Sequence, residues 1–215
     1  MKYTLLSCIA VCLIACHQAI NPNPLPIHAR WETVRLGDST TSVTFAVPEE
    51  YDTSYQYFDG NTCSYFPDQV YRYQSKQWPL RDSTYYAQEA NWWESDSTDM
   101  FTMQYFTEPR YALVDTGNLN TAMRIISRYK SIDSVTFDTI FKIGDRYMGV
   151  VVPGKMNYTE RVEVLAETEF HGTSLFLKYS LVMRDTDSTR KQNFIKRSVQ
   201  LLSTVRVYGD TLKTL

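Results

Sequence analysis

The sequence predicts an α+β fold in which a mainly antiparallel sheet is covered by helices. Most of the predicted strands follow one another as hairpins, and hairpins make their strands antiparallel. Other segments repeat apolar residues with helical spacing, and such amphipathic helices need an apolar face to pack against. Residues 31–215 are long enough to enclose one hydrophobic core, so we expect a single domain there.

The first half of this domain is predicted to contain two hairpins, then a helix and a strand. The paired strands alternate apolar and polar residues around short turns rich in Gly, Asp and Asn. In order, these elements are the strands Trp31–Leu36 and Ser42–Val47, the strands Ser54–Phe58 and Thr62–Phe66, a helix from Asp82 or Ser83 to Trp93, and the strand Met100–Phe106.

The second half is predicted to place two further hairpins between two helices. The first helix is capped by Asn118 or Asn120, because either side chain can accept from the first helical turn. Its expected apolar face holds Leu119, Ala122, Met123, Ile126 and Tyr129. The hairpins are Ser134–Ile143 with Tyr147–Val152, and Arg161–Phe170 with Thr173–Met183. The last helix starts near Asp187-Ser188 and reaches about Val205, with the apolar stripe Phe194, Ile195, Ser198, Leu201, Leu202 and Val205.

Two families share parts of this order of elements. The strand that ends in proline, Val43–Pro48, and the late strand Ser174–Met183 followed by the helix Phe194–Val205 resemble the PsbP-like α/β/α sandwich. A weaker resemblance is to lipoproteins associated with gliding motility, carried by Leu175-Phe176, Asp187-Ser188, Phe194-Ile195 and Leu201-Leu202. Neither resemblance supplies catalytic residues.

Residues 1–15 are predicted to be a lipoprotein signal peptide. Lys2 precedes an apolar run from Thr4 to Ile14, which suits an export signal and is too short for a membrane span. Leu13-Ile14-Ala15-Cys16 resembles the lipobox of bacterial lipoproteins, which implies that Cys16 receives a diacylglycerol and becomes the acylated N-terminus. The alternative is an ordinary secretory signal that is cut nearby, with Cys16 incidental.

Residues 16–30 are predicted to be the lipidated N-terminus and a proline-rich tether. Asn21–Pro26 favours polyproline II, so we expect a semi-rigid spacer between the membrane and the domain. No acidic residue occurs in His17–Ile20, directly after Cys16. The lipoprotein resemblance then implies the periplasmic face of the outer membrane, rather than the inner membrane or the cell surface.

The composition argues against several partners. The chain has 22 Lys and Arg against 24 Asp and Glu, a net charge of −2, so we expect no nucleic-acid partner. Once the leader is removed and Cys16 is lipidated, Cys63 is the single free cysteine, and we expect it to be buried. His171 is the only histidine in the predicted domain and Cys63 the only thiol, so we expect no metal site; we also expect no cofactor, since no phosphate loop or dinucleotide fingerprint is present.

The segment Tyr51–Trp93 is rich in aromatic residues and has two interpretations. Its rings can fill the core and the cross-strand pairs of the hairpins. They can also form a groove for a glycan or a peptide, and neighbouring rings on a strand point to opposite faces, so not all fit one core. The first candidates for an exposed binding surface are Tyr71, Tyr73, Trp92 and Trp93.

Asp is followed by Ser or Thr unusually often, at ten of the 14 Asp residues. This pattern resembles an O-glycosylation sequon of Gram-negative bacteria, which implies Ser39, Ser83 and Ser97 as candidate sites in accessible loops. The alternative is that Asp-Ser and Asp-Thr are favourable turn and cap pairs.

The sequence contains no catalytic motif of the common hydrolase, phosphate-loop or dinucleotide types. We therefore expect a non-enzymatic, membrane-anchored binding or assembly component of a Gram-negative envelope, with envelope proteins or glycans as partners. The alternative is a glycan-binding or glycan-processing accessory. A hydrolase would need two facing carboxylates, and the cluster to test is Glu89, Glu94 and Asp96 beside Trp92-Trp93.

Overall fold

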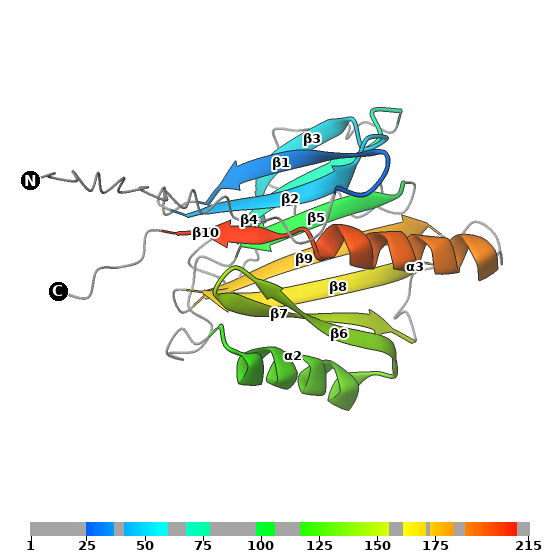
Figure 1. The fold of residues 1–215 in the computed structure, drawn as a ribbon. Coiled ribbons are helices and arrows are strands. Elements are labelled where there is room, and N and C mark those ends of the chain that lie inside the picture. The colour runs from blue at the N-terminus through cyan, green and yellow to red at the C-terminus, as the bar shows by residue number, and fades with distance from the viewer. Residues whose placement is uncertain are drawn as a thin grey trace, which may run out of the picture.

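The computed structural model describes residues 25–36, 41–59, 68–77, 98–105, 117–154, 161–170, 173–182 and 188–209. Within these ranges the chain forms two antiparallel sheets and two helices (Figure 1), so the predicted mixed, mainly antiparallel fold class is confirmed. The predicted leader, Cys16 and most of the tether lie outside them. In the part of the chain that is described, no helix is long and apolar enough to cross a membrane.

The smaller sheet combines strands from both ends of the described chain. β1 (Ala29–Arg35) pairs with β2 (Ser42–Pro48), as the first predicted hairpin required. β10 (Arg206–Tyr208) pairs with the other side of β2, which gives the order β1-β2-β10. The β10 strand was not predicted, because three residues are too few to display an alternating pattern.

The larger sheet has seven strands in the order β3-β4-β5-β9-β8-β7-β6, and every neighbouring pair is antiparallel. The strands are β3 (Thr53–Asp59), β4 (Asp68–Gln74), β5 (Met100–Tyr105), β6 (Val135–Ile143), β7 (Arg146–Pro153), β8 (Arg161–Phe170) and β9 (Thr173–Val182). The predicted strand β5 and the hairpins β6–β7 and β8–β9 are confirmed.

The predicted partner of β3 is wrong. The Asp-Gly-Asn turn signal favoured a tight hairpin with Thr62–Phe66, but β3 pairs with β4, with Asp59 opposite Asp68. The connection is therefore longer than a tight turn, and residues 60–67, which include Cys63, lie outside the described ranges, as does the helix predicted to reach Trp93.

α2 (Leu119–Ile132) packs on one face of the larger sheet. The Asn118 side chain accepts a hydrogen bond from the Thr121 N–H at 3.0 Å, so Asn118 rather than Asn120 is the cap. The helix lies close to β7 at Gly149, where an added Cβ would be 3.0 Å from the Ala122 carbonyl oxygen. Its buried residues are Thr121, Ala122, Ile125 and Ile126.

The apolar face predicted for α2 is therefore partly wrong. Leu119 and Met123 are 45% and 53% exposed, whereas Ile125 is buried. Both stripes have helical spacing, and the contact with β7 and β8 selects the stripe centred on Ile125 and Ile126. The sequence pattern alone did not determine which of the two faces the sheet.

α3 (Ser188–Leu202) and the smaller sheet together cover the other face of the larger sheet (Figure 1). Leu201 and Leu202 are buried as predicted, but the helix ends at Leu202 rather than near Val205. Val205 is also buried and lies between α3 and β10.

Aromatic rings form the contact between the two sheets. The Phe45 ring of β2 lies 5.5 Å from the Tyr73 ring and 5.0 Å from the Phe101 ring, measured between centroids. Phe101 in turn lies 4.5 Å from Tyr179 of β9. The prediction that helices cover the sheet is thus only partly right, because a second sheet provides much of the cover.

Candidate functional site

The residues predicted to form an exposed aromatic surface are not exposed where the structure describes them. Tyr71 and Tyr73 lie on β4 and are only 6% and 4% exposed. Their rings face the core, as the alternative interpretation of this aromatic segment expected. Cys16, Trp92, Trp93, Ser39, Ser83 and Ser97 lie outside the described residues, so their roles stay predictions.

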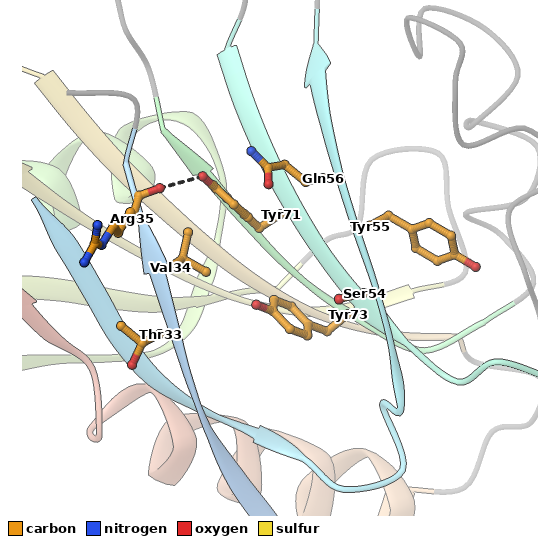
Figure 2. Close-up of a pocket in the computed structure, with 8 residues that line it drawn as sticks. All are labelled: Thr33, Val34, Arg35, Ser54, Tyr55, Gln56, Tyr71 and Tyr73. Atoms are coloured by element: carbon orange, nitrogen blue, oxygen red, sulfur yellow. Dashed lines mark hydrogen bonds between the residues drawn. The ribbon is translucent and has the colours of Figure 1, made fainter. Parts of the chain in front are cut away.

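A cleft of about 420 Å³ lies where these two tyrosines meet the smaller sheet. This volume is within the range of small-ligand sites. The cleft is lined by Thr33, Val34 and Arg35 of β1, by Ser54, Tyr55 and Gln56 of β3, and by Tyr71 and Tyr73 (Figure 2). In Figure 2 the ring of Tyr55 points away from the other lining side chains, as expected for a residue between Ser54 and Gln56 on a strand.

The two tyrosine hydroxyls point toward β1 but have different surroundings (Figure 2). The Tyr71 hydroxyl donates a hydrogen bond to the Arg35 carbonyl oxygen at 2.8 Å. The Tyr73 hydroxyl has no hydrogen-bond partner among the described residues. The Tyr73 side chain lines the cleft, where a ligand that accepts a hydrogen bond can pair with its hydroxyl.

Burial raises the pKa of both hydroxyls, so they are protonated donors at neutral pH. At Tyr73 the nearby Glu32 carboxylate raises the pKa further, while the Arg30 guanidinium acts in the opposite direction. Glu32 and Arg30 form an ion pair at 2.8 Å on the same strand, so the two charges are largely balanced.

Other polar groups of the cleft are also available to a ligand. Within the described residues, the Ser54 hydroxyl, the Gln56 amide and the Arg35 guanidinium make no side-chain hydrogen bond or ion pair. The lining residues include no carboxylate, histidine or cysteine, so they offer no general base or nucleophile pair of the usual kinds. Their chemistry suits hydrogen bonding to a polar ligand.

The cleft also lies between two sheet edges. Among the described strands, β1 is at one edge of the smaller sheet and β3 is at one edge of the larger one. Edge strands carry backbone N–H and C=O groups that no neighbouring strand satisfies. The cleft is therefore bordered by backbone donors and acceptors as well as by side chains.

A second cleft, of about 490 Å³, lies between α3 and the ends of β2 and β9. Its charged residues already pair with each other: Arg190 lies 3.3 Å from Asp99, and Arg197 binds Glu50 and the His28 carbonyl oxygen. Burial, then the Asp99 and Glu50 charges, raise the pKa of the Tyr51 hydroxyl in the same cleft. Its charges are thus less available to a ligand than the polar groups of the first cleft.

An unexpected pair of buried arginines lies on the opposite face of the larger sheet. Arg72 and Arg161 are 2% and 4% exposed. Burial is the main cause that lowers the pKa of Arg72, and the Arg161 charge acts in the same direction. The Tyr-Arg-Tyr alternation of residues 71–73 does predict that Arg72 faces away from the tyrosines, but nothing local predicts its burial.

No family model and no curated protein matches this chain. Among solved structures it is similar to the solution structure of cyanobacterial PsbP (CyanoP) from Synechocystis sp. PCC 6803, at 12% identity and a TM-score of 0.39. The similarity covers 85% of this chain and 95% of that one.

Proposed function

We propose that this chain is a non-enzymatic lipoprotein, anchored through Cys16 at the periplasmic face of a Gram-negative outer membrane. It acts there as a binding or assembly component, and its ligand occupies the cleft between β1 and β3. The observation that carries the binding site is the Tyr73 hydroxyl, which lines the cleft, is protonated, points toward β1 and has no hydrogen-bond partner among the described residues. The lipobox resemblance of residues 13–16 supports the anchor.

The glycan-binding alternative has less support from the cleft. Sugar recognition by aromatic residues uses the flat faces of their rings. Tyr71 and Tyr73 have their faces packed in the core and present only their hydroxyl edges. Trp92 and Trp93 lie outside the described residues, so a glycan site built on them stays a prediction.

The anchor is tested with Cys16→Ser in the native organism. We expect the variant to accumulate as an unprocessed or soluble periplasmic protein, because the attached lipid supplies the membrane affinity. Cell fractionation and the intact mass of the mature protein provide the measurement. A Cys16→Ser protein that stays in the membrane fraction, together with a wild-type mass that lacks acyl groups, would contradict the anchor.

The cleft is tested by placing a photo-crosslinking amino acid at Gln56 in cells. We expect adducts with an envelope component that weaken when Tyr73→Phe removes the hydroxyl. The matched control carries the crosslinker at Lys142, an exposed residue on β6, at the other edge of the larger sheet. The same adducts from both positions, or adducts unaffected by Tyr73→Phe, would show that the cleft is not the binding site.

A further inference from the structure

The outer edge of β1 faces the cleft with its backbone groups. The Arg35 carbonyl oxygen accepts from Tyr71, so the peptide groups of Arg35 point away from β2. On the other side, the Leu36 N–H donates to the Thr41 carbonyl oxygen at 2.9 Å, toward the β2 end of the hairpin. N–H and C=O of one residue point to the same side of an antiparallel strand, and the side alternates along the chain. The backbone groups of Thr33 therefore also point away from β2.

The lining of the cleft has the dimensions of a short stretch of extended chain. Three consecutive residues of β1 and three of β3 border it. At about 3.3 Å per residue, each border is about 10 Å long. An added strand can pair with an exposed edge through main-chain hydrogen bonds, which is a recurrent mode of peptide recognition.

The side chains next to this edge indicate the sequence of such a strand. Trp31, Thr33 and Arg35 alternate with the buried Val34, so they share one face of β1. Trp31 is 39% exposed, and Arg35 is exposed and makes no ion pair among the described residues. Opposite-charge and aromatic cross-strand pairs stabilise neighbouring strands. A complementary strand would place an apolar residue opposite Trp31 and an acidic residue opposite Arg35, four positions apart.

We propose that the ligand of the cleft is an extended peptide segment of a partner protein, which pairs with the outer edge of β1, an edge that no described strand covers, and carries an acidic and an apolar residue four positions apart. The Tyr73 hydroxyl donates to a main-chain carbonyl of this segment. The inference rests on the proposed function, because it names the ligand class of the same cleft. It adds that recognition depends mainly on the peptide backbone.

The experiment uses the full-length protein in detergent and a phage-displayed library of random linear nonapeptides. Enriched sequences are expected to show the acidic and apolar residues at the stated spacing. Thr33→Pro deletes an outward-facing N–H on an edge strand, a position where proline is tolerated. This substitution should raise the Kd of a synthetic peptide with an enriched sequence at least about tenfold, which corresponds to roughly 1.4 kcal/mol.

Thr33→Ala is the matched control, because it keeps the N–H and removes only the hydroxyl that bonds Thr44 at 2.8 Å. It should change the Kd less than about twofold, which is under 0.5 kcal/mol or so. A second test leaves the protein unchanged: methylating alternate backbone nitrogens of the peptide should abolish binding in one register and spare it in the other. This test stays decisive even where Thr33→Pro disturbs the fold.

The outcomes separate this inference from the proposed function. Failure to enrich any peptide, or binding that survives both Thr33→Pro and N-methylation in either register, overturns the peptide strand. A soluble oligosaccharide that binds wild type and loses affinity in Tyr73→Phe also overturns it, while the cleft remains the binding site. If neither peptides nor oligosaccharides bind at the cleft, the proposed function fails as well.

Discussion

Three tyrosine side chains of the core differ in the hydrogen bonds that their hydroxyls make. The Tyr179 hydroxyl is enclosed and donates to the Ala46 carbonyl oxygen at 2.7 Å, which links β9 to β2. The Tyr71 hydroxyl donates to β1 at the rim of the cleft. The Tyr73 hydroxyl has no such bond in the described chain. The first two hydroxyls stabilise the fold by bonding one strand to another, whereas the third lines the cleft without such a bond.

Tyr179→Phe should destabilise the protein by about 1–3 kcal/mol, because it leaves a buried carbonyl oxygen without its donor. Urea unfolding, followed by circular dichroism, measures the change in the free energy of unfolding. Tyr208→Phe is the matched control, since Tyr208 is 53% exposed, and it should have no measurable effect. Equal stability of the two variants would contradict a structural role for the Tyr179 hydroxyl.

At the scale of elements, α3 provides the helical part of the cover on the aromatic face of the larger sheet. Leu201 and Leu202 are each 1% exposed and belong to the same core as Phe45, Tyr73 and Phe101. Loss of apolar volume at the helix would therefore weaken the packing between the two sheets as well as the packing of the helix.

Leu201→Ala should reduce the free energy of unfolding by about 2–5 kcal/mol, through lost burial and the cavity that remains. Thermal and denaturant unfolding give the measurement, and Gln200→Ala, on the exposed side of α3, is the control. If the two variants have the same thermal midpoint, Leu201 does not pack on the sheet as described.

The sequence was informative where structure is local and uninformative where it is not. Hairpins such as β6–β7 are visible because alternation and a turn lie within about twenty residues of each other. Tyr71 and Tyr73 were named as site candidates from their aromatic pattern. Thr33, Arg35 and Gln56 were not, because β1 and β3 meet only through the packing of one sheet on another, which no local pattern records.

At the scale of the whole molecule, buried tyrosines make stability depend on alkaline pH. Burial is the main cause that raises the pKa of each of Tyr51, Tyr71, Tyr73, Tyr129 and Tyr179. For Tyr129 the pKa rises to about 12. In the unfolded chain these hydroxyls ionise near pH 10. Their protonated forms therefore favour the folded state fully below about pH 10, and this contribution is lost as the pH rises through the folded pKa values.

Tyrosine ionisation should therefore leave the thermal midpoint nearly unchanged from neutral pH to about pH 10. Above about pH 10 it should make the midpoint fall steeply. Ultraviolet absorbance of tyrosinate, recorded in the same samples, should show an additional rise that coincides with unfolding, when the buried rings become exposed. Tyr129→Phe should make the fall less steep, and Tyr208→Phe, at an exposed side chain, should leave it as in wild type. A Tyr129→Phe profile that falls as steeply as that of wild type would show that ionisation of this buried ring does not destabilise the fold.

The closure of the smaller sheet has a consequence for the order of events in folding. The Ala46 N–H donates to the Thr204 hydroxyl oxygen, across 158 positions of sequence, and β10 pairs with β2 over a similar separation. A folding chain can form the β1–β2 hairpin early, but it completes this sheet only when β10 reaches β2. Contacts between residues so far apart in the sequence form slowly, because the entropy cost of closing a long loop comes before the stabilising contacts are made. Closure of the smaller sheet by β10 is thus expected to be a late step of folding, after the β1–β2 hairpin has formed.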